Sequence, residues 1–143
     1  LILSKKRPNK IHSLLGIAAA PDFTEDLMWD KFSLEEKNKI TSQGIIEQVS
    51  EYSDEPYKIS KNLIFESRNC FVLREKLVLN FPVRLLQGTQ DKDVPINTAI
   101  NLINHITCND ARLEILKNAD HSFSTEACLK LISDNLKKLL EKK

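Results

Sequence analysis

Glycine is scarce in this sequence, and its scarcity excludes one class of binding site. The only three glycines, Gly16, Gly44 and Gly88, lie far apart among 143 residues. A phosphate-binding loop needs several glycines within a few residues, because its backbone must approach the phosphate closely. A flavodoxin-like domain that cradles a phosphate group is therefore not predicted.

Long apolar runs, an excess of one charge and paired cysteines are also missing. No segment approaches the ~20 consecutive apolar residues that a membrane-spanning helix needs. The 21 basic and 20 acidic residues leave no basic surplus of the kind that binds nucleic acid or anionic membranes. Cys70, Cys108 and Cys128 lack the spacing of a structural zinc site, so we expect free, buried thiols in a reducing compartment such as the cytoplasm.

The first residues have the pattern of a helix end. Leu1, Ile2 and Leu3 precede the basic cluster Lys5-Lys6-Arg7, and Pro8 follows. Basic side chains favour the last turn of a helix, and proline cannot continue it. Because a domain seldom begins with the end of a helix, residues 1–143 are expected to be a single truncated domain.

The next part of the chain predicts one buried strand and several helical segments. IHSLLGIAAA (Ile11–Ala20) is short, apolar and continuous, as in a strand covered on both faces. Thr24 is a favourable N-cap for one helix. Ser33 and Glu36 form a capping box for a second, which Gly44 would close. The stretch 50–56 is polar and turn-like, and 59–71 fits a helix loosely.

The last third alternates strands and helices. FPVRLL (Phe81–Leu86) reads as a strand that Gly88 ends, and Pro95 fits the first position of a helix. RLEIL (Arg112–Leu116) alternates polar and apolar residues, as an outer strand does. Ser124 or Thr125 would cap the final helix. This order predicts an α/β fold with a parallel sheet.

Three polar side chains follow the three predicted strands. Asp22, Asp91 and His121 stand where functional groups gather in parallel sheets, just past the carboxyl ends of the strands. An aspartate there can accept the Nδ1–H of a histidine and leave Nε2 as a general base. Asp93 competes with Asp91 for this role, although it better fits helix capping, and Asp22 is the second rival.

Two segments resemble the α/β-hydrolase family. GTQDKDVP (residues 88–95) is similar to the segment that bears the family's acid, and NADHSFS (118–124) is similar to the segment that bears its histidine. The spacing of 121 − 91 = 30 residues leaves room for one helix and one strand, and the family also has acid before histidine. IHSLLGIAAAPDFTEDLMW resembles a subgroup that includes bacterial hydrolases and acyl-protein thioesterases.

The resemblance implies the C-terminal part of a hydrolase sheet, about three strands, with a small helical cap insertion at about 22–79. It also implies cleavage of a small acyl ester or thioester through an acyl-enzyme, with Asp91 orienting and His121 moving the proton. Phe23, Met28 and Trp29 would line the acyl pocket, or would merely pack the insertion. No metal and no organic cofactor is implied.

The family's nucleophile motif, GxSxG, is absent from these residues. Ser4 lacks flanking glycines and cannot form the strained turn that presents the nucleophile. The serine and the oxyanion hole are therefore expected in a missing N-terminal half, which becomes the chain's implied partner, and this chain alone is expected to be inactive. The alternative is a non-catalytic remnant or binding module derived from an α/β-hydrolase.

Overall fold

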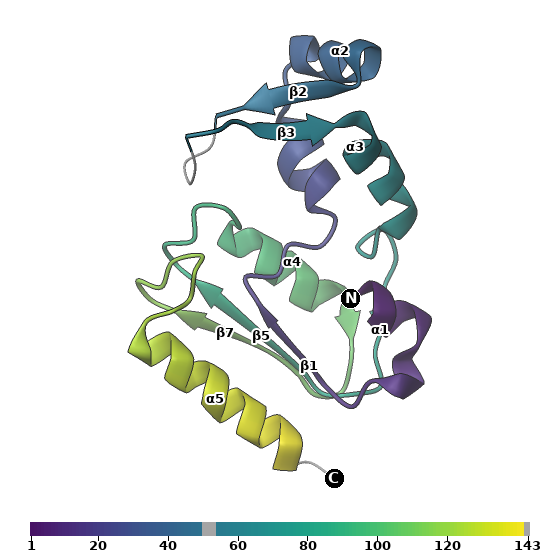
Figure 1. Ribbon diagram of the computed structural model, residues 1–143. Coiled ribbons are helices and arrows are strands. Elements are labelled where there is room, and N and C mark those ends of the chain that lie inside the picture. The colour runs from purple at the N-terminus through teal and green to yellow at the C-terminus, as the bar shows by residue number, and fades with distance from the viewer. Residues whose placement is uncertain (50–53, 142–143) are drawn as a thin grey trace. The chain divides into compact units, whose positions relative to one another are not determined.

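The computed structural model describes residues 1–49 and 54–141 and divides the chain into two compact units (Figure 1). The sheet unit combines Leu1–Pro21 with Val72–Lys143, and the small unit is Asp22–Phe71. The small unit begins where the cap insertion was expected to begin, and it ends 79 − 71 = 8 residues earlier. Leu77 and Leu79 lie instead in the core of the sheet unit. That the small unit acts as a cap stays a prediction.

Three parallel strands form the centre of the sheet unit, in the order β1 (Leu14–Ile17), β5 (Val83–Gly88) and β7 (Ala111–Leu116). Leu85 pairs with Gly16 on one side and with Leu113 on the other. All six residues of β5 are buried, because both of its edges are paired and both of its faces are covered. The predicted parallel sheet is confirmed, with the alternating strand at its edge.

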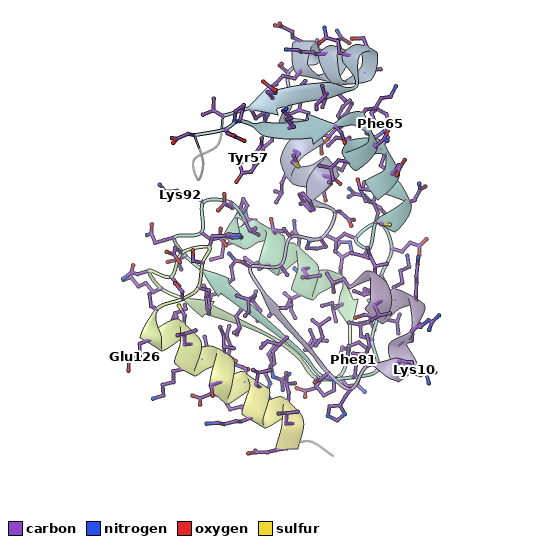
Figure 2. The ribbon with its side chains drawn as sticks, in the orientation of Figure 1. Lys10, Tyr57, Phe65, Phe81, Lys92 and Glu126 are labelled. Carbon is purple, nitrogen blue, oxygen red and sulfur yellow. The ribbon has the colours of Figure 1, made fainter. Side chains whose placement is uncertain are left out.

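Two helices cover opposite faces of this sheet (Figure 1). On one face α4 (Ile96–His105) contributes Leu102 to the main core. That core consists of Leu77, Leu79, Phe81, Val83, Leu85, Leu102 and Ile106, and Phe81 is labelled in Figure 2. On the other face α5 (Glu126–Glu141) contributes Cys128 to a second cluster, formed with Leu86, Ala119 and Phe123.

The ends of these elements follow from a few residues. The first strand is shorter than the expected Ile11–Ala20, because Ala18 adopts a left-handed backbone with φ of 46°, which a strand cannot contain. Pro95 is the residue before α4 and not its first residue. Thr125 caps α5, since its Oγ1 accepts the Cys128 N–H at 3.3 Å.

Short elements complete the sheet unit. Helix α1 (Ile2–Lys6) confirms the helix predicted at the start of the sequence, and a single 3-10 turn, η1 (Pro8–Lys10), follows it. Strands β4 (Leu77–Val78) and β6 (Ile106–Thr107) pair in parallel. Neither strand was predicted, because a strand of two residues is too short to show an alternation of polar and apolar side chains.

The small unit has its own core. Phe32, Ile40, Ile46, Ile59 and Ile64 form this core. The elements of this unit in the described residues are η2 (Thr24–Met28), η3 (Trp29–Lys31), α2 (Leu34–Gln43), β2 (Ile45–Gln48), β3 (Tyr57–Ser60), α3 (Lys61–Ser67) and η4 (Arg68–Cys70). The capping box of Ser33 and Glu36 and the closure of α2 at Gly44, with φ of 84°, are confirmed.

Other expectations for this unit are wrong. Thr24 is not a cap: η2 is a π-helix, and the Thr24 hydroxyl bonds that of Ser67 at 2.6 Å. Ile59 lies in β3, which pairs antiparallel with β2, so helix α3 occupies only part of the expected 59–71. Residues 50–53 of the expected turn lie outside the described part of the chain.

The three cysteines are free thiols, as expected, but only Cys128 is fully buried, and Cys70 is exposed. Among the helices that the structure describes, none combines the length and the apolar content needed to cross a bilayer.

A buried ion pair joins the central strand to the turn before β7. The side chain of Arg84 is 2% exposed, and its Nη2 lies 3.1 Å from an Asp110 carboxylate oxygen. The Nη1 of Arg84 donates to the carbonyls of Val83 at 2.8 Å and Asp110 at 3.1 Å. Arg112 also reaches Asp110, at 3.5 Å, but is 61% exposed. A buried guanidinium is tolerated only when its donors are paired in this way.

Removing one partner of this ion pair should lower the free energy of unfolding more than removing both partners. Asp110→Ala leaves the buried guanidinium without a carboxylate and should lower the free energy of unfolding by about 3 kcal/mol. Arg84→Met combined with Asp110→Ala should recover most of that loss, because no charge is left buried. Urea denaturation measures the free energy of unfolding of both variants. Arg112→Met is the control at an exposed partner of Asp110, and it should lower that free energy by roughly 0–1 kcal/mol. A double variant as unstable as Asp110→Ala would contradict this account.

Candidate active site

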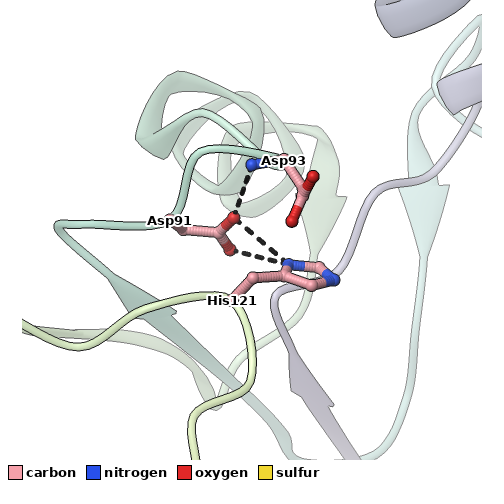
Figure 3. A group of neighbouring side chains, drawn as sticks. All are labelled: Asp91, Asp93 and His121. Carbon is pink, nitrogen blue, oxygen red and sulfur yellow. Dashed lines mark hydrogen bonds and ion pairs between the residues drawn. The ribbon is translucent and has the colours of Figure 1, made fainter. Parts of the chain in front are cut away.

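The acid and the histidine predicted from the two loop segments meet at the carboxyl edge of the sheet (Figure 3). Asp91 follows β5 and His121 follows β7, and these strands are neighbours. The Nδ1 atom of His121 lies 3.1 Å from each carboxylate oxygen of Asp91. The carboxylate is 0% exposed, whereas the histidine side chain is 46% exposed. A buried acid therefore holds a ring that remains open to solvent.

The Asp91 carboxylate is held by donors on both oxygens. Its Oδ1 accepts the backbone N–H groups of Val94 at 2.8 Å and Asp93 at 3.0 Å. Its Oδ2 accepts the side-chain amide of Gln87 at 2.9 Å. Burial acts to raise the pKa of Asp91, but the bonds from Val94, His121 and Gln87 outweigh it and hold the pKa below its ordinary value. The group is therefore an ionised carboxylate at neutral pH.

An ionised carboxylate can only accept hydrogen bonds, and this fixes the tautomer of His121. Its partner atom Nδ1 must carry the proton. The neutral ring then presents a lone pair at Nε2, which makes no hydrogen bond to any residue that the structure describes. Nε2 is thus able to accept a proton from a neighbouring hydroxyl, as a general base does.

A strained, buried phenylalanine anchors the loop that carries His121. Phe123 is 1% exposed and packs with Leu86 and Cys128. Its backbone is left-handed, with φ of 49°, which costs about 1–3 kcal/mol for a bulky residue. The Asp120 carboxylate accepts its N–H at 3.1 Å. Packing of the ring and this bond keep the loop in a conformation that presents His121 away from the core.

Gly88 allows the two loops to approach each other. A Cβ atom at Gly88 would collide with the backbone carbonyl of Ala119, two residues before His121. The Gln90 N–H donates to that same carbonyl at 2.9 Å, and the Asn118 N–H donates to the Thr89 hydroxyl at 2.8 Å. The absence of a side chain at Gly88 therefore permits the hydrogen bonds that bring His121 to Asp91.

The two rival acids have other positions. Asp93 is exposed and uses its backbone N–H to support Asp91. Asp22 belongs to the small unit, where its carbonyl accepts the N–H groups of Glu25 and Asp26 at 3.0 and 3.1 Å. Asp91 is the carboxylate that the structure brings to Nδ1 of His121.

One group within the described ranges, 1–49 and 54–141, has the side chains of a metal site. Asp91, Asp93 and His121 each offer a ligand atom, and these atoms lie within 4.8 Å of one another. However, the Asp91 oxygens already accept four N–H groups, from Val94, Asp93, Gln87 and His121. The geometry is therefore that of a hydrogen-bonded acid and histidine.

The expected pocket residues lie in the small unit, and two of them pack against its core. Met28 and Trp29 border the core cluster of that unit, and the Trp29 ring makes an edge contact with Phe65 at 5.5 Å. Arg68 stacks over both rings, at 5.3 Å from Trp29 and 4.6 Å from Phe65. Phe23 is 45% exposed. Packing accounts for Met28 and Trp29, and an acyl-binding role for the three residues stays a prediction.

Sequence reasoning missed three residues on which the site depends. Gln87 lies just beyond the predicted strand Phe81–Leu86, Gly88 is predicted only as the end of that strand, and no pattern singles out Phe123. Gly88 meets Ala119 and Phe123 packs with Leu86, which are contacts between segments far apart in sequence. Gln87 bonds Asp91, only four residues away, after the chain has turned at the end of β5. The isolated glycine at the end of a strand is the one signal that could have indicated a close backbone approach.

Comparison with known proteins shows which proteins the chain is similar to. No family model matches the chain. The sequence is 29% identical over 137 residues to the mitochondrial palmitoyl-protein thioesterase ABHD10 of Bos taurus, covering 95% of this chain and 44% of the relative. Its Homo sapiens counterpart is 28% identical over the same shares. The chain thus spans less than half the length of these curated relatives.

Two solved structures are similar to this chain in fold. A putative hydrolase from Agrobacterium vitis S4 superposes with a TM-score of 0.90 at 27% identity, over 98% of this chain and 57% of that one. Mouse alpha/beta hydrolase domain-containing protein 10 superposes with a TM-score of 0.85 at 26% identity, over 97% of this chain and 56% of that one. The likeness extends over both units of the chain.

Substituting Gly88 should separate the two loops. In Gly88→Ala the new methyl group meets the rigid backbone of Ala119, so the loops must shift, at a cost of about 1–3 kcal/mol in unfolding free energy. Thermal or urea unfolding measures this cost. Gly16→Ala is the matched control, because its methyl group meets the flexible end of Leu85 at 3.1 Å. Equal costs at the two positions would contradict the proposed close approach.

The ionised state of Asp91 should appear in the pH dependence of stability. Its pKa is lower in the folded chain than the value of about 3.9 expected when unfolded. The stability that it contributes is therefore present above about pH 4 and is lost as the pH falls through the folded pKa. Urea unfolding between pH 6 and 3 should show a steeper loss for the wild type than for Asp91→Asn.

The control for this experiment is Asp30→Asn, since Asp30 is an exposed aspartate of the small unit. That variant should follow the wild-type curve. Parallel pH curves for the wild type and Asp91→Asn would mean that Asp91 is not held ionised by its neighbours.

Proposed function

We propose that this chain, a member of the α/β-hydrolase fold family related to thioesterases, carries the acid and the base of a serine hydrolase. The enzyme would cleave carboxylic esters or thioesters. The observation that carries the proposal is the contact of a buried, ionised Asp91 with Nδ1 of the exposed His121. This contact leaves Nε2 available to activate a hydroxyl nucleophile.

The chemistry proceeds in two stages. His121 Nε2 takes the proton of a serine hydroxyl while the serine oxygen attacks the acyl carbonyl, and the same proton passes to the departing alkoxide or thiolate. A water molecule then attacks the acyl-enzyme while His121 Nε2 takes one of its protons; the acyl–serine bond breaks, and His121 returns that proton to the departing serine oxygen. Asp91 keeps the ring oriented throughout and stabilises the positive charge that the ring carries between the two transfers.

The nucleophilic serine would come from a segment outside these 143 residues. The three glycines stand at positions 16, 44 and 88, so no GxSxG turn occurs in this sequence. Strand β1 pairs with β5 on one side, and no strand from the described residues pairs with its other side. A parallel strand added at that edge would bring its carboxyl end, and a serine following it, to the edge where Asp91 and His121 lie.

The names of the relatives favour a thioester as the first substrate to test. Those relatives are palmitoyl-protein thioesterases, which indicates a long acyl chain on a thiol. The small unit, with its exposed Phe23, is the part of this chain that we propose as the cap over the acyl group. Phe23, Met28 and Trp29 are the residues with which to probe that role.

Activity should depend on both members of the pair. In the enzyme that combines these residues with the nucleophilic serine, His121→Ala and Asp91→Asn should each lower kcat by roughly 10³-fold or more, because neither variant can move the proton normally. Hydrolysis of a palmitoyl thioester, followed by thiol release, measures this loss. The matched control is His105→Ala, whose ring bonds the Asn101 carbonyl of its own helix; it should retain wild-type activity.

The same enzyme should react with a fluorophosphonate probe, whereas the 143-residue chain by itself should not. Stoichiometric labelling of any serine within these residues would show that the active site is misplaced. Full activity of His121→Ala would contradict catalysis at this site and would favour the alternative, a non-catalytic module that retains the hydrolase fold.

A further inference from the structure

A buried glutamine donates a hydrogen bond to the carboxylate of Asp91. Gln87 lies in β5, is 0% exposed, and shares a face of the sheet with Val83 and Leu85. Its Nε2 donates to Asp91 Oδ2 at 2.9 Å and to the Val94 carbonyl at 3.1 Å. Because the atoms facing Nε2 are acceptors only, they fix the orientation of the amide: the oxygen cannot take the place of the nitrogen.

We propose that Gln87 is a positioning residue for the Asp91–His121 pair, an inference that rests on the proposed function. The two oxygens of Asp91 are held differently. Backbone N–H groups hold Oδ1, through Val94 and Asp93. Apart from His121 itself, Gln87 is the donor that the structure shows for Oδ2. Gln87 therefore sets the rotation of the carboxylate about its Cβ–Cγ bond.

This rotation matters because His121 Nδ1 lies 3.1 Å from both oxygens. A carboxylate held at one oxygen alone can turn, and the ring that it orients turns with it. The second donor removes this freedom before any substrate binds, as a preorganised site requires.

The other end of the amide shows that a glutamine at this position carries a cost. Its Oε1 is buried and has no hydrogen-bond partner within the part of the chain that the structure describes. An unpaired buried carbonyl is unfavourable, and an apolar side chain in a row with Val83 and Leu85 would avoid that loss. The benefit of an amide at this position lies in its N–H groups, which bond Asp91 at 2.9 Å and also the carbonyls of Val94 at 3.1 Å and Gly88 at 3.4 Å.

The kinetic test uses an apolar replacement of similar length. In the enzyme that contains the nucleophilic serine, Gln87→Met should lower kcat by roughly 10- to 100-fold and leave KM unchanged, because it disturbs the alignment of the acid and not the binding of substrate. The matched control is Gln90→Met, the same change at an exposed glutamine three residues on. It should leave both constants unchanged.

The two proposals fail in different ways. If His121→Ala abolishes activity while Gln87→Met changes kcat by less than about threefold, Gln87 is not a positioning residue and the proposed function stands. If His121→Ala has no effect, the proposed function itself is wrong. Loss of folded protein lowers the apparent kcat and leaves KM unchanged, so kcat is calculated per folded enzyme. A loss of kcat in Gln87→Met that disappears after this correction would also contradict the positioning role.

A measurement on the unmodified 143-residue chain covers the case in which Gln87→Met does not fold. Among the described residues, the ionisable side chains gathered at this site are Asp91, Asp93 and His121, whose ligand atoms lie within 4.8 Å of one another. In NMR spectra recorded over a pH series, the side-chain amide of Gln87 should shift with the same midpoint as the Asp91 carboxyl carbon, because they share a hydrogen bond. The exposed amide of Gln90 should not follow that midpoint. A Gln87 amide that is insensitive to the titration of Asp91 would overturn the inference.

Discussion

A carboxylate that is shielded from solvent needs hydrogen-bond donors for both of its oxygens. At Asp91 the surrounding residues are arranged to supply these donors. The loop after β5 supplies two backbone N–H groups, the strand supplies Gln87, and the loop after β7 supplies the ring of His121. These donors outweigh the effect of burial and hold the pKa of Asp91 low. The charge then fixes the tautomer of His121, which gives Nε2 its basic character.

The backbone around the pair is shaped to make this contact possible. Gly88 removes the side chain that would separate the two loops, and the left-handed Phe123 turns the second loop so that its ring is buried while His121 stays exposed. A strained residue and a glycine at close approach are common where a site imposes geometry on the chain. The two loops lie side by side because they follow neighbouring parallel strands, β5 and β7.

The sequence was informative wherever a local pattern determines structure. The buried β5, the helix after Pro95, the alternating β7 and the capping box of Ser33 could all be predicted, because each depends on neighbouring residues. The pairing of Asp91 with His121 could be predicted from two segments and their separation. The π-helix η2 and the pairing of β2 with β3 could not, because each depends on contacts beyond neighbouring residues. The role of Gln87 could not either: Asp91 is only four residues away, but their bond depends on how the chain turns after β5.

The central claim is that an ionised Asp91 fixes the proton of His121 on Nδ1, and the nitrogen chemical shifts of that ring test it most directly. In the 143-residue chain, at a pH where the ring is neutral, two-bond and three-bond 15N–1H correlations should show a protonated Nδ1 and an unprotonated Nε2. Asp91→Asn should move the proton toward Nε2. A neutral wild-type ring protonated at Nε2, or a tautomer that Asp91→Asn leaves unchanged, would contradict the account.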